Sequence, residues 1–193
     1  MNHFGASSIV MNPAEVARLV ESLLFVSPEP LDLAQIARVL DVPRETVEAG
    51  LSLLSADAPR RGIHVQRLGD LLQLVSAPEA APYIERLRGS EGVAKLSTAA
   101  METLAIVAYQ QPVTRARIEA IRGVNSDRAL ATLQARGLIA EVGRLETAGR
   151  PALFGTTFEF LQHFGLHDLG DLPPLPEDLE MLIEAPDSPN DSS

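Results

Sequence analysis

The chain has 193 residues, the length of one ordinary domain or two small ones. Its 16 Lys and Arg against 26 Asp and Glu give a formal net charge of −10, which argues against a protein that coats nucleic acid by bulk attraction. The absence of cysteine excludes disulfides, thiolate metal clusters and cysteine nucleophiles. No apolar run is long enough to span a bilayer and no secretion signal opens the chain, so we expect a cytoplasmic protein with no membrane partner.

The negative charge is concentrated at one end of the chain. Residues 168–193 hold eight acids and no base, whereas residues 97–167 hold seven Arg and six acids. The last 26 residues are therefore expected to form a flexible, acidic, Pro-rich tail that is disordered at its end. Alternatively, the early part of this tail, residues 171–177, is an extended peptide that docks on the body. Residues 1–12 carry no charge and are expected to be a disordered tail.

The chain contains an internal repeat. When the sequence is shifted by 82 positions, apolar residues fall on apolar residues and Pro30 falls on Pro112. Other aligned pairs are Leu24 with Ile106 and Ile36 with Ile118. The pattern predicts two copies of one module.

The first copy shows three helix patterns and a hairpin pattern. Residues 13–26 form one apolar stripe with helical spacing, made of Val16, Leu19, Val20, Leu23 and Leu24. Asp32 is placed to cap a second helix, and a third follows the turn at residues 41–43 to about residue 54. Residues 63–66 and 72–75 flank a Gly-Asp turn and predict a β-hairpin in which His64 faces solvent.

The second copy repeats these parts. Ser97 is expected to cap a helix whose buried stripe contains Met101, Leu104, Ala105 and Ala108. Thr114 and Asn125 are expected to cap the next two helices. A hairpin at residues 138–142 and 152–154 follows, and Thr156 is expected to introduce a last helix at about 158–164, closed by Gly165.

Three helices followed by a two-stranded wing are typical of a winged helix-turn-helix. The predicted fold is mainly α with small β-wings: two tandem winged-helix domains and a flexible acidic C-terminal tail. We expect the first domain at residues 13–77, a linker helix and hinge at 78–96, the second domain at 97–167 and the tail at 168–193.

The third helix of each copy is poorly suited to reading DNA. Glu45 and Glu48 in the first copy would repel phosphate, and the second copy presents mainly small residues. One feature favours DNA, a group of arginines at 115, 117, 122 and 128, although Glu119 and Asp127 are available to pair with them. A winged-helix DNA-binding transcriptional regulator therefore stays open as the alternative function.

Catalytic patterns are lacking. His163 and His167 have helical ligand spacing, but Gly165 is expected to end the helix between them and no third metal ligand is evident. No phosphate-binding loop and no nucleophile elbow occur. We therefore expect no enzyme activity, no catalytic residue, no metal, no cofactor and no small-molecule substrate.

The second copy resembles a known family. Its motifs are STAAMETLAIVAYQQPVTR at 97–115, IEAIRGVNSD at 118–127, GLIAEVGR at 137–144, GRP at 149–151 and FGTT at 154–157. EFLQHFG at 159–165 and DLPPLPE at 171–177 follow, and ESLLFVSPEP at 21–30 fits in the first copy. Over roughly residues 14–177 the chain is similar to segregation and condensation protein B, the ScpB family of bacterial condensin subunits.

The resemblance implies a non-catalytic subunit of the SMC–ScpA–ScpB complex. Such proteins form homodimers through the first winged-helix domain and hold the kleisin ScpA, which bridges the ATPase heads of SMC. The complex acts in chromosome condensation and segregation during cell division. The implied location is the cytoplasm at the nucleoid, with DNA met only indirectly or weakly.

Two sets of contact residues are expected. Dimer contacts are placed on the first helix, at Ala14, Arg18, Glu21 and Phe25. Kleisin contacts are placed in the second domain, where polar or small loop residues are not dictated by core packing. The alternative is that residues such as Gly123, Asn125 and Gly149 only shape turns. The kleisin set is Val113, Thr114, Arg115, Arg122, Val124, Asn125, Ser126, Arg144, Arg150 and Pro151.

Overall fold

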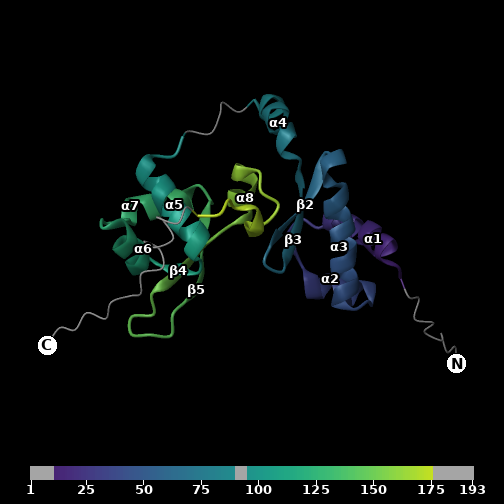
Figure 1. The fold of residues 1–193 in the computed structure, drawn as a ribbon, viewed down its shortest axis with the longest axis horizontal. Helices are drawn as coiled ribbons and strands as arrows, with labels where there is room; N and C mark the ends of the chain where they lie inside the picture. Colours follow the sequence, from purple (N-terminus) through teal and green to yellow (C-terminus); the bar gives the residue numbers. More distant parts are fainter. Residues whose placement is uncertain (1–10, 90–94, 176–193) are drawn as a thin grey trace. The chain divides into compact units, whose positions relative to one another are not determined.

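The computed structural model describes residues 11–89 and 95–175. The chain divides into two compact units, one ending at Arg88 and the other starting at Gly89 (Figure 1). Both are rich in helix and each holds one small antiparallel sheet. Three expected regions lie wholly or partly outside the described residues, namely the N-terminal tail at 1–12, the hinge near 89–92 and the acidic tail at 168–193. The domain boundaries stay predictions.

The first unit, unit 1, begins with three helices. They are α1 (Pro13–Val26), α2 (Leu33–Leu40) and α3 (Arg44–Asp57), with the two-residue strand β1 (Leu31–Asp32) before α2. Strands β2 (Ile63–Leu68) and β3 (Leu71–Ser76) form an antiparallel hairpin, and the sheet order is β1-β3-β2. Helix α4 (Ala81–Arg88) follows.

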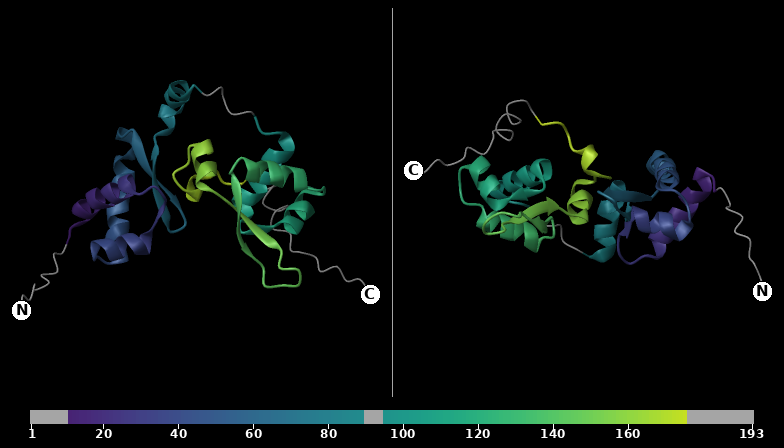
Figure 2. Two further views of the ribbon diagram at one scale, coloured as in Figure 1. Left: turned by 180° about the vertical axis from the view of Figure 1, so that it is seen from behind. Right: turned by 90° about the horizontal axis from the view of Figure 1, so that it is seen from below.

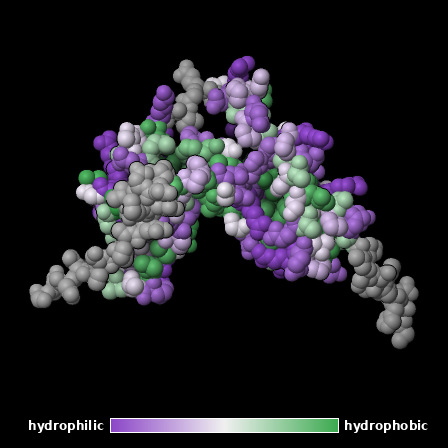
Figure 3. All heavy atoms as spheres, viewed as in Figure 1, coloured by the Kyte–Doolittle hydropathy of each residue, from purple (hydrophilic) through white to green (hydrophobic). Residues whose placement is uncertain are grey.

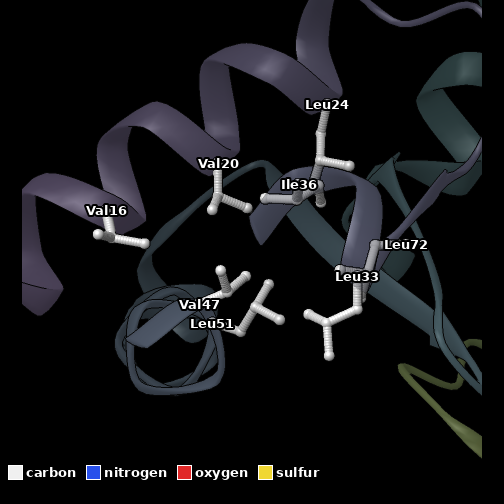
Figure 4. Close-up of a cluster of buried hydrophobic side chains, with 8 residues drawn as sticks. All are labelled: Val16, Val20, Leu24, Leu33, Ile36, Val47, Leu51 and Leu72. Atoms are coloured by element: carbon white, nitrogen blue, oxygen red, sulfur yellow. The ribbon is translucent and has the colours of Figure 1, made fainter. Parts of the chain in front are cut away.

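Local capping determines where α1 begins, and apolar spacing determines which side it buries. Asn12 and Glu15 form a reciprocal capping box with two N–O distances of 3.0 Å, and Pro13 occupies the first turn. Figure 4 shows Val16, Val20 and Leu24 pointing from α1 into a common core. The other members of this core are Leu33, Ile36, Val47, Leu51 and Leu72.

The second unit, unit 2, repeats the order of elements. It contains α5 (Thr98–Gln110), β4 (Val113–Thr114), α6 (Arg115–Arg122), α7 (Asp127–Ala135), β5 (Ile139–Arg144), β6 (Ala152–Thr156) and α8 (Phe158–Phe164). The sheet order is β4-β6-β5. Strand β4 and helix α6 lie 82 positions after β1 and α2, the offset of the sequence repeat.

The expectation that His64 faces solvent is wrong. His64 is 6% exposed and Gln66 is also buried, while Ile63 is exposed. Burial is tolerated because the polar atoms have partners. The His64 Nε2 lies 3.1 Å from the Arg61 carbonyl oxygen, and the Gln73 amide donates to Gln66 Oε1 at 3.0 Å.

The stripe expected on α5 is also displaced. Met101 and Ala105 are exposed, and Leu19 on α1 is exposed as well. Helix α5 instead buries Thr103, Ile106 and Val107 beside the expected Leu104 and Ala108. The polar Thr103 fits inside because its hydroxyl donates to the Ala99 carbonyl at 2.8 Å.

Two caps fall one residue away from their expected positions. Thr157, rather than Thr156, caps α8, and its hydroxyl oxygen accepts from the Phe160 amide at 3.2 Å. Thr156 is buried and donates to Gln111 Oε1 through its amide and its hydroxyl. Ser126 occupies the N-cap position of α7, while the Asn125 side chain accepts from the Asp127 amide. The caps at Ser97, Thr114 and Gly165 are confirmed.

Candidate protein-binding surfaces

The turn between α6 and α7 gathers most of the contact residues expected in unit 2. Thr114 caps α6 by accepting from the Arg117 amide at 3.2 Å, and Gly123 ends the helix with φ +69°. We call this group the turn cluster: Thr114, Arg115, Glu119, Arg122, Val124, Asn125, Ser126 and Asp127. These residues come together because α6, the turn and α7 form the helix-turn-helix that the sequence repeat predicts.

Ion pairs and hydrogen bonds join the members of the turn cluster. Arg115 Nε donates to Glu119 Oε1 at 3.0 Å, and its Nη1 pairs with Asp127. The same Glu119 oxygen accepts from the Ser126 amide at 2.9 Å. Arg122 reaches Ser126 Oγ and Glu102 Oε2 at 3.0 and 3.1 Å. The arginines here therefore have carboxylate partners.

Burial divides the expected contact residues into two kinds. Val113 and Ser126 are buried, and the Arg122 side chain is 7% exposed. Val124 is 55% exposed, and Asn125 and Arg115 also reach solvent. Only the second kind is positioned to touch another molecule, and the buried residues shape the surface from behind.

The rest of the expected set lies on the loop at residues 145–151 and at Arg144, the last residue of β5. This loop joins β5 to β6 and protrudes from its unit in Figures 1 and 2. Arg144 pairs with Glu141, and Arg150 pairs with Glu146 at 3.0 Å. Arg150 has φ +39°, a conformation that residues other than glycine rarely adopt. Arg144 Nη1 donates to the Arg150 carbonyl oxygen at 3.3 Å, which ties the loop to the strand.

Sheet pairing brings this loop toward the turn cluster. Strand β4 pairs with β6, with Thr114 opposite Leu153. Pro151 precedes Leu153 by two residues, so the base of the loop lies beside the start of α6. The two halves of the expected contact set are therefore on neighbouring parts of one unit.

The residues expected at a dimer contact share one face of α1. Ala14, Arg18 and Phe25 are exposed, and Glu21 is half-buried. Phe25 is 74% and Val26 is 73% exposed. Figure 3 shows that hydrophobic residues reach the surface among hydrophilic ones. An open groove, the α1 groove, is lined by Glu21, Ser22, Phe25, Val26, Ile63 and Leu74.

An ion pair beside the α1 groove joins α1 to the segment that precedes β2. Glu21 pairs with Arg61, which precedes β2 in the chain. Ile63 at the start of β2 is exposed and lines the groove together with Phe25. A cluster of exposed apolar side chains with a paired charge at its rim is typical of a protein-binding surface.

Sequence reasoning missed some members of both surfaces. Glu102 was not expected to hold Arg122, and Val26 and Ile63 were not expected to complete the α1 groove. By contrast, Glu119 and Asp127 were expected to pair with nearby arginines, and both pair with Arg115. Ile63 was missed because its alternation with His64 predicted an inward position.

Residues after α8 return to α5. Tyr109 Oη donates to the Pro173 carbonyl oxygen at 2.6 Å. Asp171 accepts from the His167 backbone amide at 2.8 Å, and this hydrogen bond lowers the pKa of Asp171 from its ordinary value. The start of the expected tail therefore contacts α5 through Pro173. This contact agrees with the alternative in which the segment docks on the body. Residues 176 and 177 of that segment are outside the described part.

Neither a metal centre nor a membrane span is found in the described part. Within residues 11–89 and 95–175, no group of three or more His, Asp or Glu is placed to hold a metal ion. Over the same ranges, none of the helices combines the length and apolar character needed to cross a bilayer.

Two small helical units with exposed apolar residues in polar surroundings are typical of proteins that act by binding other macromolecules. The family model described as "Segregation and condensation complex subunit ScpB" matches residues 18–175. A segregation and condensation protein B from Geobacillus thermodenitrificans (strain NG80-2) is 53% identical over 162 residues, covering 82% of this chain and 78% of its own. The chain belongs to the ScpB family.

Solved structures from the same family are also similar in sequence. The crystal structure of ScpB from Mycobacterium tuberculosis is 39% identical and covers 81% of this chain and 98% of its own, with a TM-score of 0.38. The dimer of an ScpB N-terminal domain complexed with ScpA peptide is also 39% identical. It covers 37% of this chain and 91% of its own, with a TM-score of 0.35.

Proposed function

We propose that this chain is the non-catalytic ScpB subunit of an SMC–ScpA–ScpB complex that condenses and segregates chromosomes during cell division. It binds the ScpA kleisin as a homodimer and reaches the SMC ATPase through the kleisin, in the cytoplasm at the nucleoid. The observation that carries this proposal is the family match across residues 18–175, which spans both units. The chain itself supplies binding surfaces, and ATP hydrolysis belongs to SMC.

Each unit is proposed to be a winged-helix domain. Support comes from the order of elements, because three helices precede a two-stranded hairpin in both units. The extra strands β1 and β4 extend the two sheets at equivalent positions of the repeat. We place the domains at residues 13–77 and 97–167, with 78–96 as the linker.

Dimerisation is assigned to the first domain and to the α1 groove. Ala14, Arg18, Glu21 and Phe25 lie on one face of α1, and Phe25 and Val26 leave large apolar surfaces in water. Burying such side chains against a second copy is favourable by about 25 cal/mol per Å² of apolar surface. A second copy presents the same face, so a two-fold contact is self-complementary.

Kleisin binding is assigned to the second domain. Val124 supplies an exposed apolar anchor, and Thr114, Arg115 and Asn125 surround it with polar groups. Arg144, Arg150 and Pro151 extend this surface along the protruding loop. The buried Val113, Arg122 and Ser126 contribute by fixing the shape of the surface.

The test is a direct binding measurement with purified full-length chain and purified ScpA from the same organism. Titration calorimetry should show binding that weakens by about tenfold or more in an Arg115→Glu, Arg150→Glu double variant. The matched control is Arg38→Glu, an exposed arginine on α2 of unit 1, which should bind normally. Unchanged ScpA affinity in a properly folded double variant contradicts the assignment of the surface.

A winged-helix DNA-binding regulator is the weaker candidate. Two of the four arginines that favour it are engaged with acids, Arg115 with Glu119 and Asp127 and Arg122 with Glu102. Helix α3 presents Glu48, which is paired with Arg67. This alternative predicts a salt-sensitive gel shift of duplex DNA at submicromolar protein. The cleanest variant is Arg128→Glu, since Arg128 is exposed whereas the Arg122 side chain is buried.

A further inference from the structure

Arg122 is an unusual residue to find inside a small domain. It is the last residue of α6, and its side chain is 7% exposed. Its Nε is buried and has no hydrogen-bond partner among the residues that the structure describes. A buried donor without a partner costs free energy, and a long charged side chain is almost never buried without a reason.

The two terminal nitrogens of Arg122 span the helix-turn-helix. Nη1 donates to Ser126 Oγ at 3.0 Å, and Nη2 donates to Glu102 Oε2 on α5 at 3.1 Å. Ser126 in turn donates through its hydroxyl to the Val124 carbonyl oxygen at 3.4 Å. The guanidinium therefore connects α5, the end of α6 and the turn that leads into α7.

Glu119 also forms hydrogen bonds with this turn. Its Oε1 accepts the Ser126 backbone amide at 2.9 Å and the Arg115 Nε at 3.0 Å. Ser126 is thus held at its amide by Glu119 and at its hydroxyl by Arg122. Gly123 and Val124, which precede it in the turn, are exposed.

A buried guanidinium whose carboxylate partner is 55% exposed is a poor way to gain stability. Apolar residues of similar volume often replace buried charged groups at no cost in folding free energy, so stability alone does not account for Arg122. Here the Arg122 side chain fixes one shape of the turn, in which the apolar Val124 side chain is exposed to solvent. Fixing a binding loop in advance lowers the entropy that binding must overcome.

We infer that Arg122 is a positioning residue that holds Val124 and Asn125 in the shape that the partner recognises, and does not itself touch the partner. Val124 is the apolar anchor of this surface. The inference rests on the proposed function for the identity of the partner, a segment of the ScpA kleisin. The fixed turn is a property of the free chain and is tested without any partner.

The principal variant is Arg122→Met, which keeps most of the side-chain volume and removes the charge and the donors. We expect a thermal unfolding midpoint close to that of the unchanged chain. Amide hydrogen exchange at residues 124–127 is expected to accelerate by about tenfold. ScpA affinity in titration calorimetry is expected to fall by about tenfold. The control is Arg38→Met in unit 1, for which all three quantities stay unchanged.

Two further variants keep the inference testable if Arg122→Met fails to fold. Glu102→Ala removes the solvent-exposed partner of Arg122 and should produce the same changes in exchange and affinity at smaller size. Val124→Asp should abolish detectable ScpA binding without altering exchange at Ser126. In the unchanged chain, absence of ScpA binding refutes the proposed function, while exchange still reports on the turn.

The inference is overturned if Arg122→Met, or Glu102→Ala in its place, leaves exchange at residues 124–127 unchanged. It is equally overturned if exchange accelerates while ScpA affinity stays the same, because the shape of the turn would then be irrelevant to the partner. Normal ScpA affinity in Val124→Asp removes Val124 as the anchor.

Discussion

Arg67 on β2 binds Glu48 on α3 through both ends of its guanidinium, with Nη1–Oε2 and Nη2–Oε1 distances of 2.7 and 3.0 Å. The pair joins the third helix of unit 1 to its hairpin. Arg44, at the start of the same helix, pairs with Asp70 in the hairpin turn. Arg44 and Glu48 of α3 are therefore both paired with residues of the hairpin, and the Glu48 carboxylate would repel phosphate.

This pair predicts how the stability of the chain depends on pH. The hydrogen bond from Arg67 holds the pKa of Glu48 below its ordinary value of 4.5. The stabilisation is fully present above pH 4.5 and is lost as the pH falls through the lower pKa of the folded state. In urea unfolding, Glu48→Gln should reduce the difference in stability between pH 7 and pH 3 by at most about 1 kcal/mol, since the pair is partly exposed. An identical pH dependence in both proteins would contradict this role of Glu48.

Gly50 allows α1 and α3 to approach closely. A Cβ at this position would lie 3.0 Å from the Ala17 backbone nitrogen and 3.1 Å from Val16 Cγ1. Gly50→Val should lower the free energy of unfolding by about 1–3 kcal/mol, because the larger side chain has no space. Gly62→Ala is the control and should be near neutral, because nothing lies within 4 Å of its added carbon. Thermal unfolding of both variants decides the matter, and wild-type stability in Gly50→Val would show that the helices separate easily.

If the α1 groove is the dimer contact, a single substitution in it should change the oligomeric state. Phe25→Asp places a charge in the proposed dimer contact and should convert the dimer to a monomer in light scattering after size exclusion, because burying an unpaired carboxylate is costly. Val39→Asp changes an exposed residue of α2 on the same unit, 60% exposed, and should leave the dimer intact. A dimeric Phe25→Asp protein would place the contact elsewhere.

Arg150 offers a test that separates binding from turn shape. Its φ of +39° suits glycine, so Arg150→Gly should leave stability unchanged or raise it by about 1 kcal/mol. Arg150→Ala keeps the strain and should be the less stable of the two variants. Both lose the guanidinium and should bind ScpA about tenfold more weakly in titration calorimetry. Normal affinity in Arg150→Gly would mean that the Arg150 side chain does not contact ScpA.

Much of the fold was predictable from local sequence signals. Proline after Ser27, the cap at Asp32 and the 82-residue repeat give α1, α2 and their counterparts α5 and α6 at or near the observed bounds. The proline and the cap act over a few residues, and the repeat extends the same assignment to the second unit. The two-residue strands β1 and β4 were not expected, because a segment so short has no periodicity of its own.

Burial was harder to predict than the positions of the elements. His64 is inside because Arg61 supplies a backbone partner, and Thr103 is inside because Ala99 does. Arg122 was expected to contact the partner directly, yet its side chain is buried between Ser126 and Glu102. Each case depends on a polar partner for the buried group, and apolar periodicity does not report such partners even where they are only three or four residues away.

The central claim is that this chain binds a kleisin and, through it, an SMC ATPase. The most direct test is purification of the tagged chain from its native cells after nuclease treatment, with mass spectrometry of what comes with it. Our account predicts recovery of ScpA and of a large coiled-coil ATPase, both retained without DNA. Their absence, with partners that disappear on nuclease treatment, would contradict it and favour a DNA-binding regulator.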